Sequence, residues 1–163
     1  MRKARLVAPE HQIYNHLMEL IPVDDELAVA EANERFYTAL EDGDLEAMEA
    51  IWLHEDWVKC VHPGWELIIG WDGVSDSWRR IFENTGGMRV SARDVQIRVL
   101  GDISWVSCTE NLAIFLDSSS APVTATTTAT NLFFRIGSEW RMVHHHASPT
   151  PASELIASSD TIQ

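Results

Sequence analysis

The sequence predicts an α+β fold in which helices come first and long strands come last. Apolar residues recur at helical spacing three times before residue 87, whereas β-branched and aromatic residues alternate with polar ones from residue 90 to residue 147. Helices with one apolar face each must pack against a sheet, and strands this long need strong twist. We therefore expect a cone-shaped, strongly curved mixed or antiparallel sheet wrapped around three helices.

Composition limits the classes of function. The chain has 163 residues and a net charge of −13, so one domain is expected, and nucleic acid and anionic membrane surfaces would be repelled. No apolar run reaches the length of a membrane-spanning helix. Cys60 and Cys108 are typical of a reduced chain, which predicts a cytoplasmic location.

Three regions are expected along the chain. Residues 1–22 form an N-terminal arm, with a short helical pattern that Pro22 ends. Residues 23–150 form a single α+β domain, and residues 151–163 form a flexible C-terminal tail.

Helix boundaries are marked by local signals. Acidic residues 24–26 suit the start of the first helix, which Gly43 closes. Asp44 caps a short second helix. A third helix carries Val74, Trp78, Ile81 and Phe82 on one face.

Two short strands, residues 57–61 and 66–69, flank a break at His62-Pro63-Gly64. The long strands follow, with tight turns at Gly101-Asp102 and Gly137-Ser138. They are expected at residues 90–100, 103–116, 124–136 and 140–147.

Several motifs occur in a familiar order. They are the runs GDLEAMEAIW, HEDWVKCVHPGWELIIGWDGVSDSWRRIFENT and GSEWRMVHHHAS. These runs resemble the nuclear transport factor 2-like (SnoaL-like) superfamily, in particular its ketosteroid-isomerase-like branch. The last hairpin is similar to the association (hub) domain of calmodulin-dependent kinase. The resemblance covers about residues 25–149 and implies the cone fold.

The isomerase branch implies a reactive group before Pro63, and His62 holds that position here. An imidazole suits general base work. The branch's oxyanion tyrosine matches Phe36, while Tyr37 is one residue off and is expected to point elsewhere. Its second acid matches the region of Thr130 and Asn131. The resemblance therefore favours proton abstraction by His62 over the familiar steroid reaction. A structural corner role for His62 remains the alternative.

The hub resemblance implies pocket positions at Trp78, Asn111 and Asn131, and neutral amides at the last two disfavour a bare carboxylate ligand. Strand alternation adds Ser107 and Thr109 beside Asn111, and Val143 and His145 on the last strand. His145, if it faces inward, could transfer a proton or could form a polar wall. Phe36, Trp78, Thr109, Asn111 and Asn131 are the predicted substrate-binding residues.

His144 and His146 share a strand face and could in principle hold a metal. That face is expected to look outward with Trp140 and Met142, so we predict no metal site. Glu110 is also expected to point outward, to a dimer interface, and the alternative is that a bulge shifts the register and turns it into the pocket.

An outer sheet face carrying Trp140, Met142, His144, His146, Val106 and Cys108 predicts a two-fold homodimer.

Two functions stay open. One is an isomerase, lyase or cyclase without a cofactor, acting on a small apolar or partly polar ligand through His62 and His145. The other is a non-catalytic ligand-binding or hub-like dimerisation domain.

Overall fold

A computed structural model describes residues 23–116 and 121–150, so the predicted arm with its short helix and the predicted tail lie outside the described residues. The elements are, in chain order, α2 (Val23–Asp42), α3 (Leu45–Ile51), β1 (Lys59–Val61), β2 (Ile68–Ile69), α4 (Trp71–Glu83), β3 (Gly87–Leu100), β4 (Ile103–Phe115), β5 (Val123–Ile136) and β6 (Glu139–Pro149).

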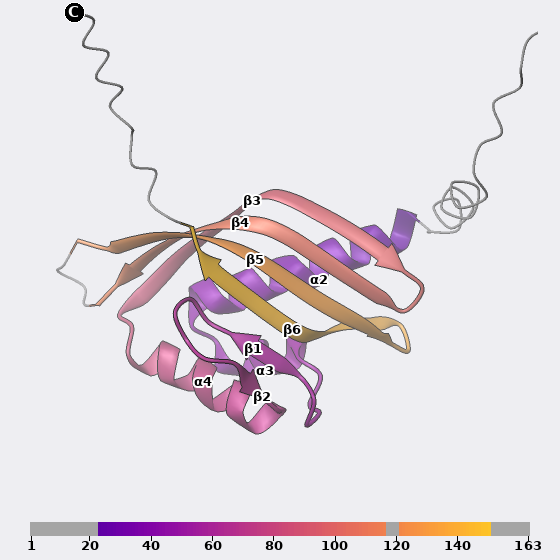
Figure 1. Ribbon diagram of the computed structural model, residues 1–163, viewed down its shortest axis with the longest axis horizontal. Coiled ribbons are helices and arrows are strands. Elements are labelled where there is room, and N and C mark those ends of the chain that lie inside the picture. Colours follow the sequence, from indigo (N-terminus) through magenta and orange to yellow (C-terminus); the bar gives the residue numbers. More distant parts are fainter. Residues whose placement is uncertain (1–22, 117–120, 151–163) are drawn as a thin grey trace, which may run out of the picture.

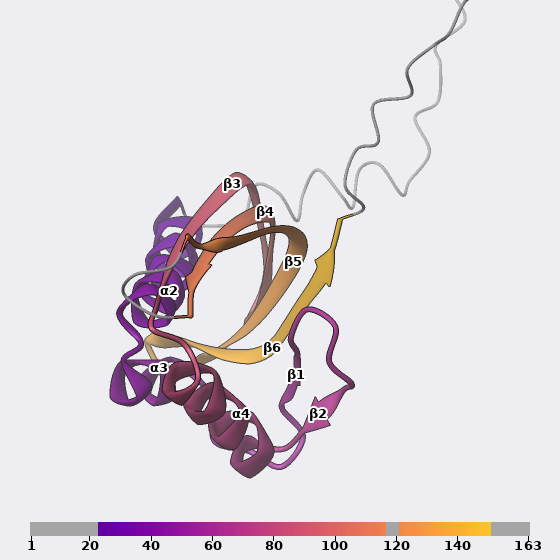
Figure 2. The same ribbon diagram turned by 90° about the vertical axis from the view of Figure 1, so that its left-hand side faces the viewer.

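The strands form one six-stranded sheet in the order β2-β1-β6-β5-β4-β3. β3 to β6 pair antiparallel, whereas β1 runs parallel to β6 and antiparallel to β2. The sheet curls without closing, and the helices lie along its open side (Figures 1 and 2). The prediction of an α+β fold with a curved mixed sheet around three helices is confirmed. None of the described helices is long and apolar enough to cross a membrane.

The helices begin where the local sequence favours it. α2 buries Val29, Ala32, Phe36 and Leu40 at helical spacing against the sheet. α3 begins after Asp44, whose Oδ1 accepts from the amide of Ala47 at 3.0 Å. α4 follows Gly70, which has a φ of 87° and packs so closely on Asp56 that a Cβ would lie 3.3 Å from its carbonyl oxygen. Glycine is the residue that suits both conditions.

Two irregularities bend the long strands. The register of β3 shifts between Arg93 and Gln96, where Asp94 takes a φ of 55°. On β6, Val143 is the extra residue, because Leu132 pairs with His144 and Phe133 with Met142. A bulge increases local twist and shifts the alternation of side chains beyond it.

The bulge at Val143 changes which side chains face inward. Trp140 and Met142 are buried before it, and His145 and Ala147 are buried after it. The prediction that Trp140 and Met142 face outward is therefore wrong. Val106 and Cys108 on β4 are buried in the same core, so their predicted outward placement is wrong too.

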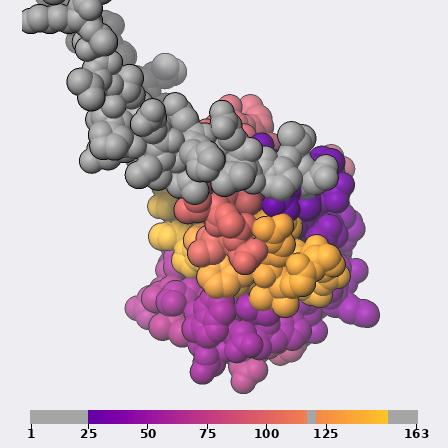
Figure 3. Space-filling model, turned by 90° about the vertical axis from the view of Figure 1, so that its right-hand side faces the viewer, coloured from indigo at the N-terminus to yellow at the C-terminus, as the bar shows by residue number. Residues whose placement is uncertain are grey.

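The apolar part of the outer face lies at the hairpin end of the sheet instead. Trp105 pairs with Leu132, Ile103 pairs with Phe134, and Trp57 packs on Phe134. Trp105 is 38% exposed and Ile103 is 42% exposed. At this end Arg135 of β5 hydrogen-bonds Asp102 of the β3–β4 turn, and the two hairpins lie side by side (Figure 3).

Candidate functional site

A cavity of about 550 Å³ opens between α4, the loop after β1 and the inner faces of β4 to β6. Its titratable residues include His62, Glu110 and His145, which are each at most 3% exposed. Most of the remaining lining is apolar and includes Leu40, Pro63, Trp65, Trp78, Ile81 and Met88. An apolar cavity with a few convergent polar groups is typical of a small-molecule site.

His62 leaves β1 toward α4 and is held there by Ser77. Its Nε2 lies 2.8 Å from Ser77 Oγ, and that hydroxyl donates to the carbonyl of Val74 at 2.7 Å. Because the single hydroxyl proton of Ser77 is used on Val74, His62 must donate from Nε2, and its Nδ1 keeps a lone pair. Burial lowers the pKa of His62 to about 4, so the imidazole is neutral at pH 7.

His145 is oriented by a buried amide. Its Nδ1 lies 2.6 Å from Asn131 Oδ1, and Asn131 Nδ2 donates to Asn33 Oδ1 at 2.8 Å. The amide oxygen can only accept, so His145 carries its proton on Nδ1 and Nε2 keeps a lone pair. Burial, with smaller contributions from His62 and other nearby histidines, lowers the pKa of His145 well below its usual value. His145 is therefore also neutral.

Glu110 projects from β4 into the same cavity. Tyr37 on α2 donates to its Oε1 at 2.8 Å, and Thr127 on β5 donates to its Oε2 at 2.5 Å. Burial raises the pKa of Glu110, while these two hydrogen bonds act in the opposite direction. Burial also raises the pKa of Tyr37, so the phenol stays protonated and continues to donate. The prediction that Glu110 points outward is wrong. The prediction that Tyr37 points away from the site is wrong as well.

The two imidazoles share one aromatic wall. The ring of Trp78 lies 4.4 Å from the ring of His62 and 5.9 Å from that of His145, and the imidazoles are 6.4 Å apart, centroid to centroid. Cys60 Sγ approaches both nitrogens of His62 at 3.7–3.8 Å, which allows only a weak contact. Two neutral bases facing an apolar cavity can accept protons from a bound molecule.

Three of the predicted substrate-binding residues lie inside the cone. Trp78 lines the cavity. Phe36 is fully buried, with its ring 5.0 Å from that of His145, and supports the wall from α2. Asn131 is also fully buried and contacts His145, so the structure places it as a support for the imidazole.

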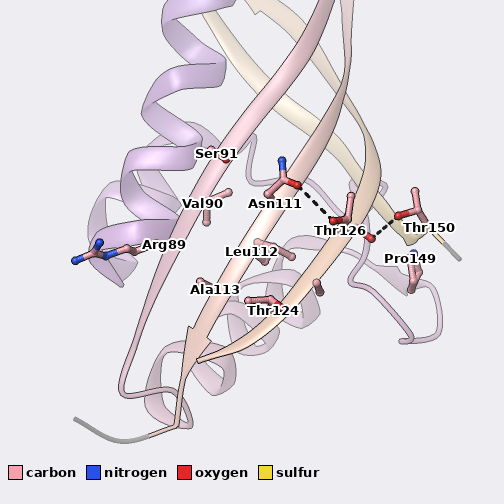
Figure 4. Close-up of a pocket in the computed structure, with 11 residues that line it drawn as sticks. Arg89, Val90, Ser91, Asn111, Leu112, Ala113, Thr124, Thr126, Pro149 and Thr150 are labelled. Carbon is pink, nitrogen blue, oxygen red and sulfur yellow. Dashed lines mark hydrogen bonds between the residues drawn. The ribbon is translucent and has the colours of Figure 1, made fainter. Parts of the chain in front are cut away.

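Thr109 and Asn111 lie on the other face of β4, and their predicted placement in the cone is wrong. The buried residues of this strand are Ser104, Val106, Cys108, Glu110 and Leu112, so the residues between them face outward. The same phase places Ser107 outward. Asn111 Oδ1 accepts from Arg93 at 3.0 Å. It also accepts from Thr126 at 3.3 Å (Figure 4).

A second, open hollow of about 840 Å³ surrounds Asn111 on this outer side, between Ser91, Thr124 and Pro149. Among the described residues that line it, Arg89 is the one with a formally charged side chain (Figure 4). The side chains that can take up or release a proton, His62, Glu110 and His145, therefore line the cavity inside the cone, although it is the smaller of the two.

The neighbouring histidines do not add to the cavity. His144 and His146 pair with Lys59 and Val61 of β1 on the other face of β6 from His145. Their rings are 6.1 Å apart. Among the described residues no cluster of three histidine, cysteine, aspartate or glutamate side chains is placed to hold a metal ion.

Sequence reasoning missed three residues of the site, Tyr37, Ser77 and Glu110. The sequence did carry a signal for Glu110, because it lies on the same strand face as Val106, Cys108 and Leu112, and an apolar face of that kind is expected to look toward the core. Ser77 precedes Trp78 on α4, and only the fold brings it to His62. Tyr37 follows Phe36, and α2 is buried broadly enough to turn both rings inward.

The family is shown by a match to the family model of the SnoaL-like domain over residues 29–153. The chain belongs to the SnoaL-like family. A solved structure of a proposed dehydratase from the NTF2-like family of Streptomyces avermitilis is 35% identical, has a TM-score of 0.75, and covers 81% of this chain and 100% of its own. The SnoaL-like and NTF2-like relationship predicted from the motifs is confirmed.

Two further relatives have other descriptions. A proposed calcium/calmodulin-dependent kinase II association domain from Thiobacillus denitrificans is 32% identical, with a TM-score of 0.63, over 74% of this chain and 93% of its own. The F-box protein SKIP8 of Arabidopsis thaliana is 34% identical over 121 residues, which cover 74% of this SnoaL-like chain. The chain spans about half, 49%, of the length of that curated relative.

Proposed function

We propose that this SnoaL-like domain is a cofactor-independent lyase or isomerase that removes a proton from carbon in a small, largely apolar substrate. The observation that carries the proposal is the pair of buried neutral imidazoles, His62 and His145, each held at one nitrogen by an oxygen of the protein. The other nitrogen keeps its lone pair, which in His62 has only the weak contact with Cys60 Sγ at 3.8 Å. A neutral imidazole that lines a largely apolar cavity can act as a general base.

The relative described as a dehydratase favours elimination of water as the reaction. In that reaction one imidazole takes the proton from carbon. The electron pair of the C–H bond forms the new C=C bond as the C–O bond breaks, and the departing hydroxide takes a proton to leave as water. The imidazolium formed in the first step supplies that proton, so atoms and charge balance without a cofactor.

Deuterium exchange tests the proposal without knowledge of the natural substrate. A panel of β-hydroxy ketones and β,γ-unsaturated ketones is incubated with the protein in heavy water, and NMR follows loss of the C–H signal. Wild type should catalyse exchange or elimination for at least one member. His62→Gln and His145→Gln should reduce the rate by about 10²- to 10⁴-fold, because glutamine cannot take up a proton near neutral pH. A folded wild type that is inert across the panel counts against the proposal.

A non-catalytic assembly domain is the second candidate, and the similarity to an association domain together with the apolar outer face favours it. We propose that two copies of the chain pair through Ile103, Trp105, Leu132 and Phe134. Sedimentation velocity should give a dimer at micromolar concentration, and Trp105→Asp should give a folded monomer. A monomeric wild type contradicts this pairing.

We also propose a cytoplasmic location. It is supported by Cys60 and Cys108, which are both free thiols in the core.

A further inference from the structure

The polar groups inside the cavity share a property that the proposed reaction does not require. Where one of these groups donates a hydrogen bond, the acceptor is another residue of the protein. His62 donates from Nε2 to Ser77, and His145 donates from Nδ1 to Asn131. The second nitrogen of each ring therefore carries only a lone pair, and that of His62 has one weak contact, with Cys60 Sγ at 3.8 Å.

Glu110 adds acceptor capacity in its ionised form, which burial disfavours and the hydrogen bonds from Thr127 and Tyr37 favour. Its two oxygens each accept one hydrogen bond, from Tyr37 and from Thr127, and a carboxylate can accept more than two. Tyr37 and Thr127 spend their protons on Glu110, so neither hydroxyl is free to donate to a ligand. The described residues give Glu110 no lysine or arginine partner.

The remaining donors lie nearer the solvent than the three acceptors, because Arg80 and Asn84 are exposed and Thr85 is half-buried. Arg80, Asn84 and Thr85 line the cavity from the end of α4, where Arg80 pairs with Asp76 at 2.7 Å and Thr85 donates to the carbonyl of Ile81. The indole Nε1 of Trp78 has no partner among the described residues, but this atom is itself buried and so is not offered to the cavity.

We propose that His62, Glu110 and His145 form an acceptor-only subsite, which binds a ligand through its own hydroxyl or amine donors and rejects carboxylates and phosphates. A ligand carboxylate would be desolvated beside three acceptors without gaining a donor, whereas a hydroxyl or an ammonium gains one or more. The amide side chains that sequence reasoning placed in the cavity would have made it able to donate. The structure places Asn111 outside the cone and commits Asn131 to Asn33 and His145.

The subsite lies in the cavity of the proposed enzyme, but its test uses probes that cannot react. Benzyl alcohol, benzylamine, benzyl methyl ether and benzoate share a ring and differ in the donor or charge they carry. Binding to the full wild-type chain is measured by NMR titration at pH 7, with shifts of the His145 imidazole nitrogens placing the probe in the cavity.

Benzyl alcohol and benzylamine should bind at least about tenfold more tightly than benzyl methyl ether, and benzoate should bind most weakly. A preference for the amine over the alcohol assigns the larger share of recognition to the charge of Glu110. Equal affinities assign it to the neutral imidazoles, and both results support the subsite. An ether or a benzoate that binds as tightly as the alcohol overturns it. This failure would leave proton abstraction intact, because the deuterium-exchange result does not depend on it.

Two further measurements keep the inference independent of any one variant. Glu110→Gln exchanges an acceptor for a group that can donate, so the preference for benzylamine over benzoate should shrink by about tenfold. Should that variant fail to fold, the wild-type imidazole nitrogens still report the tautomers. A proton on Nδ1 of His145 and on Nε2 of His62 is expected, and a proton on the opposite nitrogen of either ring would overturn the acceptor-only assignment.

Discussion

The phenol of Tyr37 on α2 donates to the carboxylate of Glu110 on β4 across 2.8 Å, and this contact joins α2 to the strand that lies next to the β3 edge of the sheet. Tyr37 and Glu110 are both buried, so neither group can exchange its partner for bulk water. The contact therefore fixes the carboxylate of Glu110 relative to α2.

Tyr37→Phe should lower the free energy of unfolding by about 1–3 kcal/mol, because it leaves a buried carboxylate oxygen without its donor. Urea denaturation measures the change. Thr38→Val, at an exposed position next to it on α2, is the matched control and should change stability by less than about 0.5 kcal/mol. A loss for Tyr37→Phe no larger than that of the control would show that the hydrogen bond contributes nothing.

His62 should make stability depend on pH. Its pKa is lowered from 6.5 to about 4 by burial, so the folded state binds fewer protons than the unfolded state between these values. Stability should therefore rise with pH across this window, and His62 should account for about 3 kcal/mol of the rise. Denaturation of wild type and His62→Gln at a series of pH values isolates this share. Parallel curves for the two proteins would mean that His62 titrates normally.

The same lowered pKa moves the expected pH–rate profile. From the sequence alone, the reaction rate is expected to rise near neutral pH, where an ordinary imidazole loses its proton. With a pKa of about 4 for His62, any proton abstraction by this base should rise with pH through about 4 and stay level at neutral pH. Initial rates of deuterium exchange between pH 3 and pH 8 test it. A limb near pH 6.5 would show a base exposed to solvent.

Trp78→Ala should cost about 3–5 kcal/mol of stability, since the side chain is only 2% exposed and packs on Phe36, His62 and Phe82. It should also remove one wall of the cavity. Trp105→Ala is the control for loss of an indole on the outer face, where the side chain is 38% exposed, and it should cost far less. Thermal denaturation of both variants measures the loss of stability, which should be larger for the buried Trp78 than for the exposed Trp105.

A pair of asparagine variants separates the two faces of the sheet. Asn131→Leu should change the tautomer balance of His145 and weaken benzyl alcohol binding, because the imidazole loses the oxygen that holds its Nδ1 proton. Asn111→Leu should leave both readouts unchanged, because Asn111 faces Arg93 and Thr126 on the outer side. The contrary result, an effect of Asn111→Leu alone, would place the ligand in the outer hollow.

The fold could be predicted from the sequence because its signals are periodic and local. Helical spacing in α2 and α4, glycines at the turns and long alternating strands each survive an error of one or two residues. The site could not be predicted to the same degree, because an error of one residue on a strand exchanges the faces. The assignment of Asn111 inward required Glu110 outward, and both were wrong together.

On β6 the difficulty has a different origin. The single extra residue Val143 shifts the alternation midway along the strand, so no regular pattern could place both Trp140 and His145 inward. His62 was found because the resemblance gives its place before Pro63. Ser77 and Asn131 owe their contacts with the imidazoles to the fold, which brings together residues 15 and 14 positions apart.

The bulge at Val143 also gives the three consecutive histidines a consequence of their own. If the bulge were lost and the strand end moved by one position, His144 or His146 would take the inward place of His145. An imidazole would then still face the cone. The run His144-His145-His146 thus makes the last strand tolerant of small insertions and deletions upstream of it. A library of variants with one residue added or removed around Val143 tests this. It should retain an inward histidine more often than a second library in which His144 and His146 are also changed to asparagine.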